Sequence, residues 1–141
     1  MLVDANLLVY AADQHSPFHS RASSWLEEQV NGPVRVGLPW SSLLAFLRIT
    51  TNPRATLTPL AIGDAWGVVS GWLAADTVWI PSPGTRHAEI LGALLSTTHA
   101  GANHVPDAHL AALAIEHGLT VYSNDSDFSR YPGLRWANPL A

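Results

Sequence analysis

The sequence predicts an α/β fold in which a central parallel sheet of four to five strands carries helices on both faces. Short apolar runs alternate with longer segments of helical spacing along the whole chain, as in βαβ units joined by right-handed crossovers. Residues 1–3 and 119–123 are the clearest runs, because apolar or β-branched side chains fill them almost without interruption. Such runs are typical of strands that a parallel sheet buries on both faces.

The local pattern predicts each element in turn. Strands are expected at residues 1–3, 34–38, 78–81 and 119–123, with an edge strand at 134–136. Helices are expected where apolar side chains recur every three or four residues, at residues 7–12, 18–30, 40–51, 59–73, 85–98 and 108–117. Most helix starts carry a capping side chain or a proline at the first helical position: Asn6, Ser16-Pro17, Ser41 or Ser42, and Thr58-Pro59. Residues 101–104 are expected to form a loop before the last helix.

Length and composition indicate one domain spanning residues 1–141. Of the 141 residues, 48% are hydrophobic and 13% are charged, a balance that favours a real core over disorder. The chain contains no cysteine, which excludes disulfides and thiolate chemistry and fits a reducing cytoplasm. The sequence has neither a basic and apolar leader nor a run of ~20 apolar residues. We therefore expect a soluble, cytoplasmic protein without a membrane span.

The charge of the chain constrains its partners. All seven basic residues are arginine, and the formal net charge is −4 at pH 7. That charge argues against a broad, non-specific coat of nucleic acid around the protein. If a protein of this charge binds nucleic acid, it needs a local basic patch, a bound cation or a basic partner.

Four acids are expected on one rim of the sheet. Asp4 follows the first strand, Asp107 opens the last helix, and Asp125 and Asp127 follow the fourth strand, at strand ends where open α/β sheets place their ligands. Crowded carboxylates repel one another unless a cation is bound, and oxygen ligands alone select Mg²⁺ or Mn²⁺ over Zn²⁺. Taken alone, each acid also has a structural explanation: Asp4 as a cap or turn acid, Asp107 as an N-cap, and the other two as polar loop residues.

Such a site supports phosphoryl transfer by metal-activated water, without a Ser, Cys or His nucleophile. The glycines lack the spacing of a phosphate-binding or dinucleotide-binding loop, which argues against an NTPase or a nicotinamide enzyme. His99, His104 and His109 lie close together in the sequence but match no zinc-binding pattern.

Three segments in this order resemble the PIN-domain ribonucleases: residues 2–6 (LVDAN), 106–114 (PDAHLAALA) and 123–128 (SNDSDF). The size of the chain and residues 42–54 (SLLAFLRITTNPR) look like the VapC toxins of bacterial toxin–antitoxin pairs. The all-arginine, tryptophan-rich composition is like that of actinobacterial members. The likeness spans essentially the whole chain.

The resemblance implies a single PIN-like domain that uses Mg²⁺, or Mn²⁺ in its place, to cleave structured RNA, either transfer RNA or ribosomal RNA. It also implies a homodimer, and a VapB-type antitoxin that wraps the toxin and blocks the site. Carried over by position, Asp4, Asp107 and Asp125 would be catalytic residues and metal ligands. Asp127 would be a further ligand that supports the pocket.

Other polar residues receive supporting roles from the same resemblance. Asn6 and Ser123 would orient the acids. Arg48, Arg54 or Arg130 would contact RNA phosphate beside the cation, while the antitoxin would supply basic groups of its own.

One position departs from the family pattern. The family commonly has a Glu on the third helix, shortly before the Arg that corresponds to Arg48, and this chain has Ala45 there. No acid lies between Glu28 and Asp64. Two outcomes remain open. In the first, water or the remaining acids fill the gap, and the chain is a working Mg²⁺-dependent endoribonuclease. In the second, the chain is a catalytically weakened PIN-fold binding module that acts by binding RNA or the antitoxin.

A phosphatase or a receiver domain that uses Asp4 as nucleophile or phosphoacceptor is a third hypothesis. A receiver domain would carry a lysine late in the chain, and this chain has none.

Overall fold

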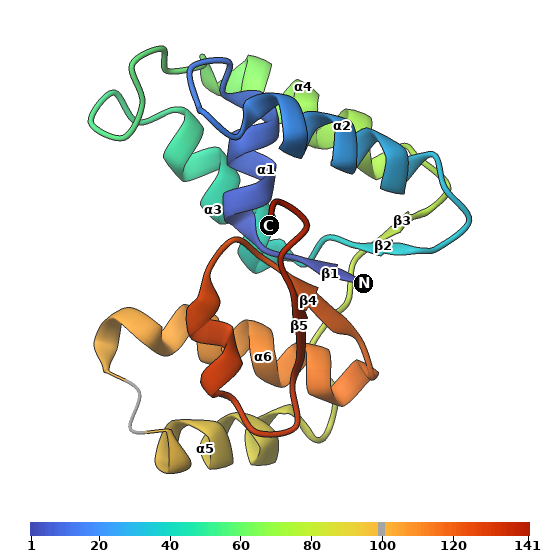
Figure 1. Ribbon diagram of the computed structural model, residues 1–141, viewed down its shortest axis with the longest axis vertical. Helices are drawn as coiled ribbons and strands as arrows, with labels where there is room; N and C mark the ends of the chain where they lie inside the picture. Colours follow the sequence, from blue (N-terminus) through green and yellow to red (C-terminus); the bar gives the residue numbers. More distant parts are fainter. Residues whose placement is uncertain (99–100) are drawn as a thin grey trace.

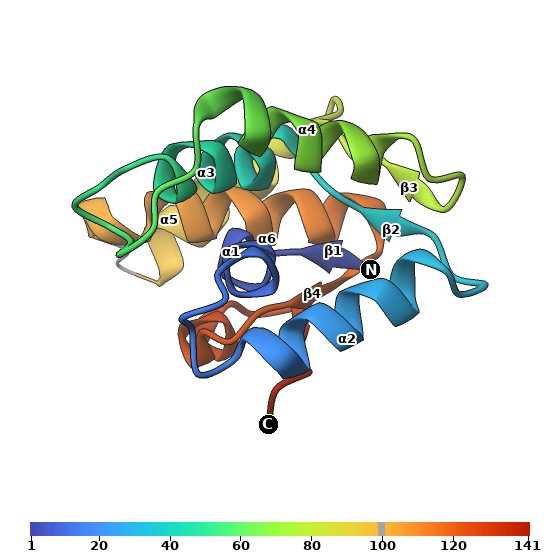
Figure 2. The same ribbon diagram turned by 90° about the horizontal axis from the view of Figure 1, so that it is seen from above.

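The computed structural model describes residues 1–98 and 101–141, which form a five-stranded parallel sheet covered by helices on both faces (Figures 1 and 2). The strands, in chain order, are β1 Leu2–Val3, β2 Val36–Gly37, β3 Val78–Trp79, β4 Thr120–Tyr122 and β5 Arg135–Ala137. Their order across the sheet is β3-β2-β1-β4-β5. The predicted fold class is confirmed, including the edge position of the last strand.

Among the described residues, six α-helices connect and cover these strands: α1 Ala5–Ala12, α2 His19–Val30, α3 Trp40–Thr50, α4 Ile62–Leu73, α5 His87–Thr97 and α6 Val105–His117. Two short 3₁₀ helices are also present in the described part of the chain: η1 Ala102–His104 precedes α6, and η2 Ser126–Arg130 precedes β5. Residues 102–104 therefore form a helical turn rather than the expected loop. His99, one of the three neighbouring histidines, lies outside the described residues.

The sheet separates two hydrophobic cores. Leu2 faces the core formed with α5 and α6, whereas Val3 faces the core formed with α1 to α4. Figure 1 shows α5 and α6 below the strands and the other four helices above them. Both side chains are fully buried. Successive residues of a strand point to opposite faces of the sheet, and each face is covered by a hydrophobic core. The central position of β1 explains why the chain begins with an uninterrupted apolar run.

Four predicted helix caps are wrong. Helix α1 begins at Ala5 and is capped by Asp4, whose Oδ1 accepts from the Ala5 amide at 2.8 Å, so Asn6 is not the cap. Helices α2, α3 and α4 begin at His19, Trp40 and Ile62 without a side-chain cap.

Ser16, Thr58 and Ser42, which suggested three of these caps, take part in other hydrogen bonds, Thr58 through its backbone amide. Ser16 Oγ accepts from the Phe18 amide at 3.1 Å, and Thr56 Oγ1 accepts from the Thr58 amide at 3.4 Å. Both bonds close local turns instead of helix ends, a known competition for short polar side chains. Ser42 Oγ donates to the Val3 carbonyl at 2.8 Å, so this residue joins α3 to β1.

No helix in the described part of the chain is long and apolar enough to cross a membrane.

The Ser42 bond yields a stability prediction. Ser42 is 3% exposed, and Ser42→Ala removes the donor to the Val3 carbonyl at the end of the central strand. We expect the free energy of unfolding to fall by about 1 kcal/mol, measured by urea denaturation. Ser41→Ala, at an exposed neighbour, is the matched control and is expected to change stability by less than ~0.5 kcal/mol. Equal effects of the two substitutions would contradict this account.

Candidate acidic site at the carboxyl edge of the sheet

Asp4 occupies the junction between β1 and β4. Its amide donates to the Tyr122 carbonyl at 3.0 Å, which extends the β1–β4 ladder by one residue. Its two carboxylate oxygens have different partners. Oδ1 accepts from the Ala5 amide at 2.8 Å, and Oδ2 accepts from Ser123 Oγ at 2.7 Å. The carboxylate is thereby fixed in orientation at the edge where the parallel strands end.

Ser123 links the first strand to the segment that follows the fourth. Besides donating to Asp4, its hydroxyl accepts from Asn6 Nδ2 at 3.1 Å and from the Asp125 amide at 3.0 Å. A hydroxyl has one donor and two acceptor positions, and all three are used here. Because Ser123 is fully buried, this saturation avoids the cost of an unpaired buried polar group.

The two acids after β4 lie at the start of η2. Asp125 caps η2, and its Oδ1 accepts from the Asp127 amide at 2.9 Å. The Asn124 amide donates to Asn6 Oδ1 at 3.4 Å, which turns the Nδ2 end of the Asn6 side chain toward Ser123. Asn6 and Ser123 thus connect Asp4 to Asp125, the arrangement expected of residues that orient the acids.

Asp107 approaches from the other side, on the first turn of α6. The N-cap of α6 is His104, which makes no side-chain cap bond, and Asp107 is the third helical residue. The expectation that Asp107 is an N-cap is therefore wrong. In the described part of the chain, its carboxylate makes no hydrogen bond or ion pair. Within the described residues, no protein group therefore competes with a ligand for the Asp107 carboxylate.

The electrostatics indicate that the four acids lie close together. The pKa of Asp107 is raised to about 6, mainly by burial and further by repulsion from Asp4, Asp125 and Asp127, while His104 acts in the opposite direction. Burial also raises the pKa of Asp4, and Asp125 adds to the rise. The hydrogen bonds from Ser123 and Ala5 favour the ionised form of Asp4 and limit that shift.

Basic and phenolic groups border the acids. Arg130 Nη2 lies 3.7 Å from Asp127 Oδ1, and His104 Nδ1 lies 4.0 Å from Asp127 Oδ2. Tyr131 Oη donates weakly to the His104 carbonyl at 3.5 Å. Burial raises the pKa of the Tyr131 phenol, and the neighbouring Asp107 carboxylate adds to the rise. Sequence reasoning identified Arg130 but missed His104 and Tyr131, which precede and follow the acids without any recognisable motif.

The acids do not form a ready-made metal cage. Among the described residues, no group of three or more His, Asp or Glu side chains is arranged to hold a metal ion by itself. The acids are close enough for their repulsion to contribute to the raised pKa of Asp4 and Asp107, yet they are not arranged to enclose a bare ion. This donor set fits a hydrated Mg²⁺ or Mn²⁺, which keeps several waters and uses only one or two carboxylates.

Three predicted positions make no hydrogen bond or ion pair with the acids in the described part of the chain. Ala45 is half-buried on α3, and the helix has no acidic residue. Arg48 and Arg54 are exposed, on the last turn of α3 and in the following loop. No ion pair between either arginine and an acid is present in the described part of the chain. Of the three arginines expected near phosphate, the structure brings only Arg130 to the acids.

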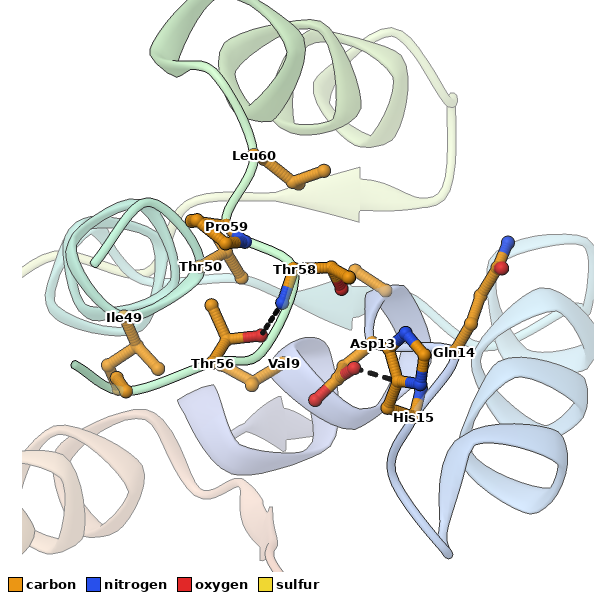
Figure 3. Close-up of a pocket in the computed structure, with 12 residues that line it drawn as sticks. Val9, Asp13, Gln14, His15, Ile49, Thr50, Thr56, Thr58, Pro59 and Leu60 are labelled. Carbon is orange, nitrogen blue, oxygen red and sulfur yellow. Dashed lines mark hydrogen bonds between the residues drawn. The ribbon is translucent and has the colours of Figure 1, made fainter. Parts of the chain in front are cut away.

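A cavity of about 350 Å³ lies elsewhere, at the far ends of α1 and α3 (Figure 3). Figure 3 shows Val9, Ile49 and Leu60 among its apolar lining. Of the described residues that line it, Asp13 is the one carboxylate, and its Oδ1 accepts from the His15 amide at 3.0 Å. The cavity therefore lacks the convergent acids that the sheet edge has, and we assign the chemistry to the sheet edge.

Comparisons with known proteins find matches that span nearly the whole chain. The model of the PIN domain family matches residues 1–134. Ribonuclease VapC37 of Mycobacterium tuberculosis is 44% identical over 140 residues, which cover 99% of this chain and 97% of that protein. Ribonuclease VapC33 of the same organism is 38% identical, over 99% of this chain and 98% of that protein.

Solved structures share the fold. VapBC2 from Rickettsia felis, bound to a DNA fragment from its promoter, has a TM-score of 0.69 at 17% identity and covers 97% of this chain and 96% of that chain. VapC20 of Mycobacterium tuberculosis, described as a sarcin–ricin loop cleaving toxin, has a TM-score of 0.69 at 18% identity, with coverages of 95% and 98%.

The raised pKa of Asp107 yields a prediction for the metal-free protein. A carboxyl whose pKa is higher in the folded state than in the unfolded state costs stability once it ionises. The cost should therefore appear as the pH rises from about 4 to about 6. We expect Asp107→Asn to stabilise the metal-free protein by about 1 kcal/mol at pH 7, a value reduced for partial exposure. The gain should vanish near pH 4.

Thermal unfolding between pH 4 and pH 8 in a chelator measures this effect. Asp64→Asn is the control, because Asp64 is an exposed acid on the first turn of α4. A metal-free Asp107→Asn protein that is no more stable than the wild type at pH 7 would count against the crowding of the acids.

Proposed function

The chain belongs to the PIN-domain family, and from this premise we propose that it is a ribonuclease toxin of the VapC type. The observation that carries the proposal is the gathering of Asp4, Asp107, Asp125 and Asp127 at one edge of the sheet, where burial and then repulsion from the other three acids raise the pKa of Asp107. Relatives that are named ribonucleases, and of which this chain covers 97% and 98%, support it. Family membership disfavours the phosphatase and receiver-domain hypotheses.

Asp4, Asp107 and Asp125 are the catalytic carboxylates of this proposal, and together with Asp127 they hold a divalent cation, Mg²⁺ or Mn²⁺. The cation, when bound, supplies an activated water and neutralises charge on the scissile phosphate. The four acids repel one another in the metal-free protein, and a bound cation relieves that repulsion. The free energy that crowding costs the fold is thus partly recovered when the site is loaded.

The neighbouring residues orient and balance these groups. Ser123, backed by Asn6, keeps the Asp4 carboxylate in a fixed direction through its 2.7 Å hydrogen bond. Arg130 offsets part of the negative charge from its position 3.7 Å from Asp127. The same guanidinium can turn to an RNA phosphate, for which its fork of donors is well suited.

The substrate of this proposal is structured RNA, either transfer RNA or ribosomal RNA. A chain with a net charge of −4 repels RNA at long range, so binding depends on local contacts. The cation and Arg130 would provide them at the acids. The exposed Arg48 and Arg54 would extend the path of the backbone along α3 and the loop after it.

A VapB-type antitoxin is the proposed partner, and a homodimer is the proposed assembly, in the cytoplasm. Solved structures that share this fold include VapBC complexes from Rickettsia felis and Salmonella typhimurium. An antitoxin that places a basic side chain among the four acids would inhibit the site. The basic group would relieve the repulsion between the acids in place of the cation and so would compete with cation binding.

A catalytically weakened binding module is the second candidate. It is favoured by Ala45, which leaves α3 without an acid, and by the incomplete cage of acids among the described residues. Such a module would bind RNA or the antitoxin without cleaving RNA.

Substitution of the acids tests the first candidate. We expect Asp4→Asn and Asp107→Asn to lower the rate of RNA cleavage by roughly a hundredfold or more and to relieve growth arrest on expression. Asp64→Asn should keep full toxicity, because its side chain is exposed on α4. Growth curves and sequencing of RNA 5′ ends after brief induction are the measurements. Variants as toxic as the wild type, with cleavage that persists in a chelator, would refute the mechanism.

Ala45→Glu separates the two candidates. If the site works as it stands, adding a carboxylate on α3 should change the cleavage rate by less than about threefold, because a hydrated cation needs few protein ligands. If the chain is a binding module, the wild type should cleave no RNA at any Mg²⁺ or Mn²⁺ concentration, and Ala45→Glu should gain activity. Cleavage of a labelled transfer RNA by both proteins decides the matter.

A further inference from the structure

The C-terminal segment, residues 135–141, lies beyond the residues that the family model matches, yet it packs against the acidic site. The Ser123 amide donates to the Ala137 carbonyl at 3.1 Å. The Trp136 indole Nε1 donates to the Ser123 carbonyl at 3.1 Å. Both backbone polar groups of Ser123, the residue whose hydroxyl binds Asp4, are therefore held by this segment.

Asn138 adds a side-chain connection. Its Oδ1 accepts from the Leu140 amide at 2.9 Å, which turns its Nδ2 toward Asn124, and that Nδ2 donates to Asn124 Oδ1 at 3.0 Å. The backbone amide of Asn124 donates to Asn6 Oδ1, and Asn6 Nδ2 donates to Ser123 Oγ. Hydrogen bonds thus connect Asn138 to the hydroxyl on Asp4 in two stages that meet at Asn124: Asn138 holds the side chain of Asn124, and the backbone amide of Asn124 holds Asn6.

The directions of the bonds at Asn6 and Ser123 depend on one another, because the backbone amide of Asn124 can only donate. Asn6 donates to Ser123 only while its Oδ1 faces the Asn124 amide. With Asn6 and the Asp125 amide as donors to Ser123, the one hydrogen of the hydroxyl is left for Asp4 Oδ2. Partners outside the ligand shell commonly fix the orientation of a ligating carboxylate in this way, and their loss weakens metal binding.

We propose that Asn138 is a positioning residue of the acidic site, which acts through Asn124 and Asn6 to keep the Ser123 hydroxyl on Asp4. The C-terminal segment is then part of the cation site rather than only an edge of the fold. The inference deepens the proposed function and rests on it for the identity of the cation, but the hydrogen-bond chain can be tested in the metal-free protein.

The same segment provides a control that leaves this chain of bonds intact. Leu140 is buried in the core with α1 to α4, and Arg21 Nη1 on α2 donates to its carbonyl at 2.7 Å. Arg21→Ala therefore loosens the segment without removing any bond between Asn138 and Asp4. Asn124→Ala provides a second test variant, because it removes the acceptor for Asn138 Nδ2.

The test compares Asn138→Ala, Asn124→Ala and Arg21→Ala in the full chain. Manganese binding, followed by the loss of the free Mn²⁺ EPR signal, should weaken roughly threefold to tenfold in the two Asn variants and stay at the wild-type value in Arg21→Ala. The Asn124→Ala/Asn138→Ala double variant should bind no more weakly than the weaker single variant, because the two residues act as a unit. Thermal midpoints, measured in parallel, report general loosening.

In the metal-free protein, the side-chain amide NMR signals of Asn6 should shift in Asn138→Ala and not in Arg21→Ala. Unchanged Asn6 signals and wild-type Mn²⁺ affinity in Asn138→Ala would overturn the proposal, as would an equal loss of affinity in Arg21→Ala. Failure of the proposed function has a different signature: the wild type would cleave no RNA with Mg²⁺ or Mn²⁺, whatever the behaviour of the Asn variants.

Discussion

The hydrogen bond from the Ser123 hydroxyl to Asp4 is the interaction on which the acidic edge depends. It joins the residue after β1 to the residue after β4, at 2.7 Å, between two strands that are adjacent and parallel. Parallel pairing brings the ends of these strands to one edge, and the bond then fixes one carboxylate there. Because Ser123 is fully buried and every position on its hydroxyl is used, neither residue can turn away without leaving a buried polar group unpaired.

Around that bond the fold gathers groups that repel one another. Burial and neighbouring carboxylates raise the pKa of both Asp4 and Asp107, so the metal-free protein is less stable for having them together. Such a cost is typical of sites arranged for a charged ligand rather than for stability. Arg130 offsets part of it at Asp127, which lies 3.7 Å from its guanidinium.

Much of this structure could be predicted from sequence, because the signals were local. Buried runs and helical spacing indicated the parallel sheet, and the acids were identified by their positions after strands or at a helix start. The helix caps were mispredicted because Asn6 and Ser42 use tertiary partners, Ser123 and the Val3 carbonyl, in place of their own helix ends. Asn138 was missed for the same reason. Its partner Asn124 is distant from it in the chain, and no sequence spacing predicts this contact. The resemblance to PIN domains identified the family correctly, whereas the roles of individual residues remain predictions.

The central claim is that the four acids form one cation site. It is tested most directly by titrating the purified wild-type protein with Mn²⁺ at pH 5 and pH 7.5 and measuring both affinity and proton release. Since the pKa of Asp107 is about 6 in the metal-free protein, protons should compete with the cation at the lower pH. The account predicts binding that is at least several-fold weaker at pH 5 than at pH 7.5. It also predicts that the protein releases protons to the buffer when it binds Mn²⁺ near pH 6. Binding of equal affinity at both pH values, without proton release, would contradict it.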